Sequence, residues 1–186
     1  MLELGCGAGH IGLAAAVLSG SHVVQVDRDP AACRWARVNA ATNGCAELVE
    51  QRCGLAENVL GLAERFAVVI ADPPYVPSDE VHLHPDDLAG AIDGGPDGLG
   101  AIRSFVRAVS DHLDPDGSIV LQVRGLRQVA HVEGWLAHPS SPALVVAEAR
   151  SYGETRALAR IEVTPGIARR PAVAQDQNKP SRGADR

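Results

Sequence analysis

Short apolar runs alternate with segments of helical spacing along most of the chain, a pattern typical of a parallel β-sheet covered by helices on both faces. Apolar runs of strand length predict strands at residues 2–4, 22–27, 48–51, 66–71, 118–123, 143–149 and 155–163. Segments of helical period predict helices at residues 11–19, 30–43, 57–65, 102–113 and 129–136. The last two strands are joined by a short link, so we expect them to pair antiparallel at one sheet edge. The predicted fold class is therefore α/β.

Two polar stretches interrupt this alternation. Residues 72–98 form a long polar loop, and a loop of that length in a compact domain usually carries function. Residues 114–117 (DPDG) predict a tight turn. Apolar content falls near Pro165, which predicts one domain at 1–165, with its first strand cut short at the N-terminus, and a disordered polar tail at 166–186.

The charge of the chain is uneven. Seventeen basic and 23 acidic residues give a net charge of −6 over 186 residues. Residues 168–186 carry five basic and two acidic residues, which leaves −9 for the body. An acidic body argues against non-specific binding of nucleic acid through its phosphates. No apolar stretch reaches the ~18 residues of a membrane helix, and the N-terminus does not look like a secretory leader, so we expect a cytoplasmic protein without a membrane partner.

The first motif that can carry chemistry is the turn Glu3-Leu-Gly-Cys-Gly-Ala-Gly9, between an apolar strand and a helix. Glycines at such a turn let the backbone approach a ligand closely and leave helix N–H groups facing it, which favours a nucleotide-like ligand. The string at 7–12 also matches the dinucleotide fingerprint G-x-G-x-x-G. The register disfavours that reading, because in the fingerprint the first glycine directly follows the strand, whereas the predicted strand already ends at Leu4.

The second motif is Asp27, at the end of the next predicted strand and 18 positions beyond Gly9. A carboxylate at that place can accept hydrogen bonds from the two vicinal hydroxyls of a ribose. Both a nicotinamide cofactor and other adenosine-bearing cofactors would use it. The motif therefore supports a nucleoside ligand without deciding between them.

The third motif is Asp72-Pro73-Pro74-Tyr75, directly after the apolar strand at 66–71. Two prolines fix the backbone, so the carboxylate, the intervening carbonyls and the aromatic ring are held in one geometry. Hydrogen-bond acceptors beside an aromatic face suit a planar group that bears NH₂, because the acceptors orient the nitrogen while the ring stacks. The strand's carboxyl end is also where open α/β sheets bind ligands.

The other candidate residues give weaker evidence about function. The run at 82–87 (HLHPDD) could be drawn as a metal cluster of His82, His84, Asp86 and Asp87, but it lacks a rigid further ligand, so we expect these residues over the substrate cleft and no metal site. Trp35 and Trp135 fit core packing. The cysteines have no C-x-x-C spacing and are expected to be reduced and mostly buried; they are Cys6, Cys33, Cys45 and Cys53.

In this order and spacing the three motifs resemble the S-adenosylmethionine-dependent methyltransferases of the seven-strand Rossmann-like class, and among them the amino-group methyltransferases whose fourth motif reads (Asn/Asp)-Pro-Pro-Tyr. Residues 39–44 (NAATNG) and 94–99 (GGPDGL) look like the release factor glutamine methyltransferase family. The resemblance covers residues 2 to about 163. It implies a mostly parallel seven-strand sheet with an antiparallel edge strand, and transfer of a methyl group from S-adenosylmethionine to nitrogen.

The resemblance also implies roles for individual residues. Asp72 and the Pro73 carbonyl would take the acceptor NH₂ group while Tyr75 stacks, which makes these three the catalytic residues; Pro74 would join them in binding the substrate. Within the glycine turn Glu3 would orient the amino group of the cofactor, and Asp27 would hold its ribose. The cofactor-binding residues implied are Glu3, Gly5, Cys6, Gly7, Ala8, Gly9, Asp27, Gly54 and Asp72.

The chain departs from the family pattern in two places. The glutamine enzymes begin the fourth motif with Asn, whereas Asp72 is more usual in enzymes that act on exocyclic amines of adenine or guanine. An acidic residue usually follows the third strand, where this chain has Cys53-Gly54. We expect a planar amide or amine as acceptor, first of all a glutamine side chain of a protein such as a translation release factor, with a nucleic-acid base as the alternative.

Two further alternatives belong to other functional classes. A nicotinamide-dependent oxidoreductase would use the glycine turn and Asp27 but leave the Asp72–Tyr75 motif without a task. A degenerate, non-catalytic domain that binds cofactor or a partner protein is favoured by the short first strand. An activating partner protein and the oligomeric state stay open.

Overall fold

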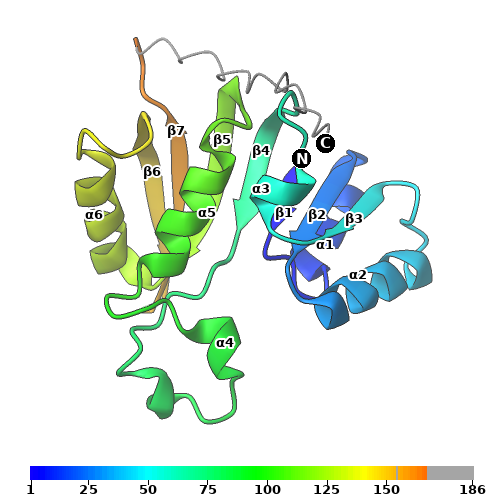
Figure 1. Cartoon of the computed structure of the whole chain (residues 1–186), viewed down its shortest axis with the longest axis horizontal. Coiled ribbons are helices and arrows are strands. Elements are labelled where there is room, and N and C mark those ends of the chain that lie inside the picture. Colours follow the sequence, from blue (N-terminus) through cyan, green and yellow to red (C-terminus); the bar gives the residue numbers. More distant parts are fainter. Residues whose placement is uncertain (154, 167–186) are drawn as a thin grey trace, which may run out of the picture.

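The computed structural model describes residues 1–153 and 155–166, and within them one sheet of seven strands (Figure 1). The strands are β1 Leu2–Leu4, β2 Val23–Asp27, β3 Val49–Cys53, β4 Phe66–Ala71, β5 Leu113–Val123, β6 Leu144–Tyr152 and β7 Arg156–Val163. The helices are α1 His10–Ser19, α2 Pro30–Thr42, α3 Ala56–Val59, α4 Ala89–Ile92, α5 Gly100–Ser110 and α6 Gly125–Leu136, with a 3₁₀ helix at Val81–Leu83. None of these helices is long and apolar enough to cross a membrane.

The strand order is β3-β2-β1-β4-β5-β7-β6. Pairing is parallel from β3 to β5, and β7 runs antiparallel to both β5 and β6. The predicted mostly parallel sheet with an antiparallel edge is therefore confirmed. The chain leaves β1 toward β2 in one direction and returns to β4 on its other side, so the two carboxyl ends lie together, with Leu4 opposite Ala71. Ligands of open α/β sheets bind at such a switch point.

The glycine and proline signals begin and end the first helices as the sequence predicts. Gly20 ends α1 in a left-handed conformation, and its N–H donates to the Ala16 carbonyl. Asp29 caps α2, because its side chain accepts a hydrogen bond from the Ala31 N–H, and Pro30 occupies the first turn. Gly44 adopts a φ of 68° just after α2.

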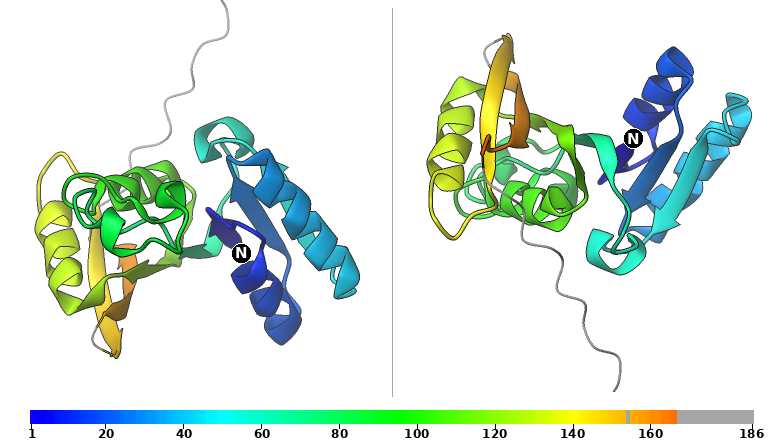
Figure 2. Two further views of the ribbon diagram at one scale, coloured as in Figure 1. Left: turned by 90° about the horizontal axis from the view of Figure 1, so that it is seen from below. Right: turned by 90° about the horizontal axis from the view of Figure 1, so that it is seen from above.

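Helices cover both faces of the sheet, although unequally. On the β1–β3 side α1 and α2 pack through small residues such as Ala16, Cys33 and Ala36 (Figure 2). Helices α5 and α6 pack over β5–β7 and bury the larger part of the apolar core, including Ile102 and Val132. Burial of this apolar surface is the main stabilising term of the fold.

The structure corrects four expectations. The helix expected at 57–65 is the four-residue α3, because Leu60 turns to an extended conformation. The turn at 114–117 lies inside β5 as an irregularity, since Leu113 pairs with Phe66 but Ser118 with Val68. The loop at 72–98 contains α4 and the 3₁₀ helix. Trp35 is 61% exposed and therefore not a core residue, whereas Trp135 packs against the core.

Two further expectations concern the ends of the molecule and the thiols. Residues 167–186 of the expected tail lie outside the described residues. The cysteines are free thiols, three of them buried and Cys53 exposed. Burial of most thiols is thus confirmed.

Candidate active site

The glycine turn follows β1 in a left-handed backbone conformation. Gly5, Gly7 and Gly9 have φ values of 67°, 55° and 84°, a region that other residues enter at a cost. The N–H groups of Gly5 and Cys6 donate to the Val26 carbonyl at 2.8 and 3.1 Å, which ties the turn to β2. Gly7 has open space where a side chain would stand. The turn therefore presents backbone to the outside beside the N-terminus of α1.

Asp27 lies at the end of β2 and connects three pieces of the predicted cofactor region. One carboxylate oxygen accepts the Gly7 N–H at 2.8 Å, and the other accepts the Asp29 N–H at 2.8 Å. The Asp27 carbonyl accepts the Gly54 N–H at 2.8 Å. The structure thus brings Asp27, Gly7 and Gly54 together.

A buried polar pair, Glu3 and Gln25, lies behind the glycine turn. The Gln25 amide nitrogen donates to the Glu3 carboxylate and to the Gly9 carbonyl, both at 2.8 Å. Both side chains are almost fully buried, at 3% and 1% exposed. Burial raises the pKa of Glu3 to about 7, and the hydrogen bond from Gln25 opposes that rise. A side chain at Gly12 would overlap the Glu3 carboxylate, so this glycine makes room for the pair.

Of the other residues of the turn, Ala8 is partly exposed. Cys6 is buried, its thiol donates to the Gln51 side-chain oxygen at 3.6 Å, and burial raises its pKa to about 12. Cys6 and Ala8 can therefore meet a ligand only through the backbone or the alanine methyl group. The Ala8 carbonyl accepts a hydrogen bond from the Asn39 side chain at 2.9 Å, which anchors the turn to α2.

Asp72 follows β4 at the neighbouring carboxyl end. The Gln122 amide on β5 donates to one of its carboxylate oxygens at 2.9 Å and leaves the other free to accept. Partial loss of water around the carboxyl raises the pKa of Asp72, while Gln122 and then the charge of Arg156 lower it. Asp72 is thus an exposed acceptor that the hydrogen bond from Gln122 orients.

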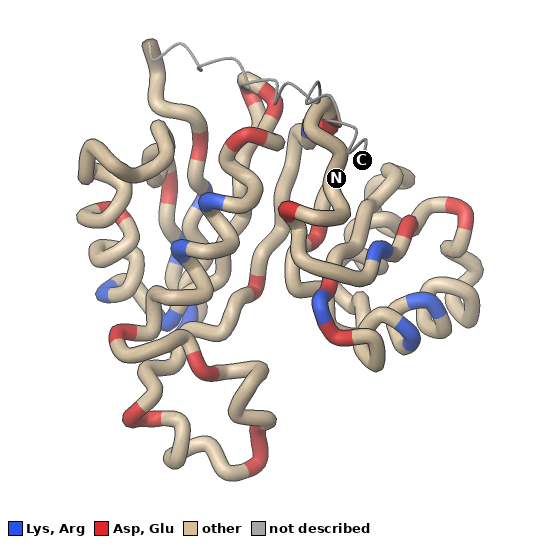
Figure 3. The backbone as a smooth tube through the Cα atoms, viewed as in Figure 1, with Lys and Arg blue, Asp and Glu red and all other residues tan. Residues whose placement is uncertain are grey.

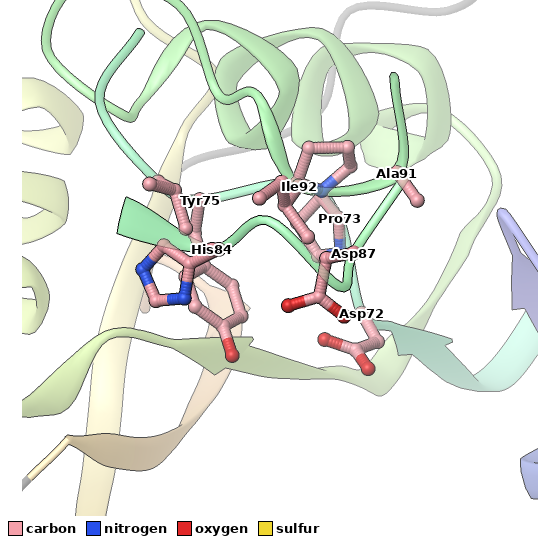
Figure 4. Close-up of a pocket in the computed structure, with 9 residues that line it drawn as sticks. Asp72, Pro73, Tyr75, His84, Asp87, Ala91 and Ile92 are labelled. Carbon is pink, nitrogen blue, oxygen red and sulfur yellow. The ribbon is translucent and has the colours of Figure 1, made fainter. Parts of the chain in front are cut away.

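The Asp72–Tyr75 segment lines a cavity of about 200 Å³. Figure 4 shows the Asp72 and Asp87 carboxylates, the His84 ring and Tyr75 among the side chains that line this cavity. The wall opposite the Asp72–Tyr75 segment comes from the loop; its lining residues are His84, Asp87, Ala91 and Ile92. Chemically, the cavity offers carboxylate and carbonyl acceptors beside an aromatic ring.

Residues 77–92, which we call the cap, extend from the carboxyl edge of the sheet as a small lobe (Figure 1). Hydrogen bonds close its base: the Val76 N–H donates to Ile92, and the Gly94 N–H donates to Val76, at 2.9 and 2.8 Å. Of the residues expected over a substrate cleft, His84 and Asp87 line this cavity, whereas His82 and Asp86 do not. Among the described residues no group of three or more such side chains could hold a metal ion.

Sequence reasoning missed three glutamines that support this site. Gln25 and Gln122 lie on strands whose neighbours are apolar, and Gln128 is 7% exposed on α6. A polar amide inside an apolar strand was the available signal, because a buried amide requires partners. The Gln128 nitrogen donates to the Tyr75 carbonyl at 3.0 Å.

Known proteins share parts of this sequence. The family model "Ribosomal protein L11 methyltransferase (PrmA)" matches residues 1–72. The release factor glutamine methyltransferase of Xylella fastidiosa is 33% identical over 145 residues, which are 73% of this chain and 52% of that protein. The ribosomal protein uL3 glutamine methyltransferase of Bradyrhizobium diazoefficiens is 30% identical over 159 residues, 83% of this chain and 48% of that protein. The chain spans about half the length of these curated relatives.

Solved structures share the fold. The ribosomal protein L11 methylase of Lactobacillus delbrueckii subsp. bulgaricus aligns with a TM-score of 0.63 at 17% identity, over 88% of this chain and 68% of that one. An RNA methyltransferase from Salinibacter ruber, in complex with S-adenosyl-L-homocysteine, aligns with a TM-score of 0.55 at 20% identity, over 91% and 84%. The expected resemblance to release factor glutamine methyltransferases and the Rossmann-like methyltransferase fold are therefore confirmed.

Proposed function

We propose that the chain catalyses transfer of a methyl group from S-adenosylmethionine to the side-chain nitrogen of a glutamine in a protein. One observation carries the proposal: the Asp72–Tyr75 cavity begins at the carboxyl end of β4, and β4 pairs with β1, whose carboxyl end leads into the glycine turn. A donor bound at the turn and an acceptor bound in the cavity would therefore meet at the switch point of the sheet. The sequence relatives named as glutamine methyltransferases support the same reaction.

The residues at the glycine turn fit S-adenosylmethionine. The left-handed glycines allow the backbone to approach the methionine part, and the free space beside Gly7 leaves it room. Asp27 would accept the ribose hydroxyls, and the backbone at Gly54 lies next to it. The bound cofactor supplies an already activated methyl group, so the protein's part is binding and orientation. A nicotinamide cofactor bound at the glycine turn would leave Asp72 without a role in the reaction.

On the acceptor side, Asp72 and the Pro73 carbonyl would accept the two N–H bonds of the amide. An amide nitrogen is a poor nucleophile because its lone pair is delocalised. Acceptors placed out of the amide plane favour a tetrahedral nitrogen whose lone pair can point at the methyl group. Gln122 holds one oxygen of Asp72, and the free one remains for the acceptor. Tyr75 would stack on the planar group.

The charge of the cap supports a protein acceptor over a nucleic acid. The cap has four acidic residues and no lysine or arginine (Figure 3). Such a surface repels phosphates at the entrance to the cavity. Asp72 in place of Asn is the observation that favours an exocyclic base amine instead, and the experiment below includes that outcome. A translation release factor is the first acceptor to test. Since release factors act in the cytoplasm, the proposed reaction takes place there.

Transfer of a tritiated methyl group from S-adenosylmethionine in a cell lysate tests the proposal. Parallel reactions receive nuclease or protease before the label is counted. We expect label that survives nuclease and is lost with protease, and that acid hydrolysis of the protein releases as methylamine, because hydrolysis cleaves the methylated side-chain amide. Label lost with nuclease would move the acceptor to a base. Absence of both label and cofactor binding would favour the degenerate domain.

A further inference from the structure

Gln128, on α6, is hydrogen-bonded to both ends of the loop at 72–98. Its side-chain oxygen accepts the Arg124 N–H at 2.7 Å, and its nitrogen donates to the carbonyls of Tyr75 and Gly98 at 3.0 and 3.1 Å. Tyr75 precedes the cap and Gly98 follows it. One buried carboxamide therefore holds the two chain segments between which the cap extends.

The junction is closely packed around Gly98. A side chain at Gly98 would begin 2.6 Å from the Tyr75 carbonyl oxygen and 3.0 Å from the Gln128 nitrogen, so glycine permits the close approach. The two Val76 hydrogen bonds to Ile92 and Gly94 lie next along the chain and close the base of the cap. An unmade hydrogen bond at such a buried junction is costly, which makes Gln128 decisive for its geometry.

We infer that Gln128 is a positioning residue for the acceptor cavity, which it assembles by holding Tyr75 against Gly98 and so placing the cap over Asp72. Gln128 acts through the backbone, because the cavity itself is lined by residues 72–76 and by the cap. The kinetic part of this inference rests on the proposed function. The structural part, the closure of the cap base, does not.

Two substitutions separate the hydrogen bonds. Gln128→Met keeps the size and removes every hydrogen bond of the side chain. Gln128→Glu keeps an acceptor for the Arg124 N–H but cannot, as carboxylate, donate to the two carbonyls. Exposed Arg127→Ala, on the same helix, is the neutral control. The matching substitution at the glycine turn is Gln25→Met, at a buried residue. It should weaken the binding of S-adenosylmethionine and leave the acceptor cavity unchanged.

Three quantities are measured for each folded variant: the affinity for S-adenosylmethionine by calorimetry, the half-saturating amount of a nuclease-treated protein lysate, and amide hydrogen exchange at Val76 and Gly94. Both Gln128 variants should raise the half-saturating acceptor concentration on the order of tenfold, leave donor affinity within twofold and speed the two exchange rates. Gln25→Met should weaken donor affinity with little change at Val76 and Gly94.

The outcomes distinguish the inference from the proposed function. Unchanged acceptor saturation and exchange in a folded Gln128 variant would overturn the inference, as would an equal loss of donor affinity. If neither Gln128 variant folds, the residue stabilises the whole domain and the inference is wrong. A wild-type chain that neither binds cofactor nor transfers methyl would sink the proposed function, while faster exchange in the variants would still support the positioning role.

Discussion

The two halves of the proposed active site are built differently. The donor half is a short turn between β1 and α1, backed by the buried Glu3–Gln25 pair and tied to Asp27 by the hydrogen bond from the Gly7 N–H to the Asp27 carboxylate. The acceptor half is a long loop whose cap stands away from the sheet, with most of its residues exposed. The fixed geometry of the donor half suits a ligand of constant shape. A cap that is joined to the domain only at its base can adopt different positions for different acceptors. We therefore expect donor and acceptor functions to separate under mutation.

The largest effect is expected at Asp72. Asp72→Ala removes an acceptor for the substrate N–H and should lower the methyl transfer rate on the order of a hundredfold to a thousandfold. Donor affinity should stay within a few-fold, because the glycine turn is untouched. Asp86→Ala, an exposed cap residue that does not line the cavity, is the control. Near wild-type turnover of Asp72→Ala would remove this residue from the mechanism.

Gly12→Ala should damage the donor half. The new methyl group would overlap the Glu3 carboxylate, and overpacking of that kind costs about 1–3 kcal/mol of unfolding free energy. Affinity for S-adenosylmethionine should fall with it. Gly90→Ala, in α4 of the cap with open space around it, should leave both unchanged. Urea unfolding and calorimetry measure the two effects, and equal results for the two variants would contradict the comparison.

The raised pKa of Glu3 predicts that the free energy of unfolding depends on pH. Its pKa is about 7 in the folded chain against 4.5 as reference, so the folded state binds this proton more tightly than the unfolded state. The contribution is complete below pH 4.5 and is lost as the pH rises through about 7, at no more than about 1.4 kcal/mol per pH unit. Glu3→Gln should remove this part of the slope. The free energy of unfolding in urea is measured between these pH values for wild type and variant. The same dependence on pH in both would show that Glu3 does not have a raised pKa in the folded chain.

The smallest effect is expected where Arg124 pairs with Glu80 of the cap. Both side chains are more than a third exposed, and such pairs contribute about 0–1 kcal/mol. Arg124→Ala should change acceptor saturation less than threefold, with a smaller change at high salt. A loss as large as that of Gln128→Met would mean that the ion pair, and not the buried amide, places the cap.

The proximity of the glycine turn and Asp27 could be predicted from the sequence because its signals are local. A glycine turn after an apolar strand and an acid at the end of the next strand need only the order of a parallel sheet to come together, and Gly7 does contact Asp27. The glutamines could not be assigned in the same way. Gln128 meets Tyr75 across 53 positions, and Gln122 meets Asp72 across 50, so their partners depend on tertiary packing.

The cap shows the same limit for secondary structure. Its short helices have little intrinsic stability, and they depend on the hydrogen bonds that close the base. The turn predicted at 114–117 is instead an irregularity within β5, because sheet pairing on both sides keeps these residues in the strand. Local turn signals do not reveal such pairing.

The most direct test of the account is mass spectrometry of proteins methylated by the chain and S-adenosylmethionine. The account predicts a single methyl group on a glutamine side-chain nitrogen, formed together with S-adenosylhomocysteine and absent from reactions with Asp72→Ala. A methyl group found only on nucleic acid, or glutamine methylation that persists in the Asp72→Ala reaction, would contradict it.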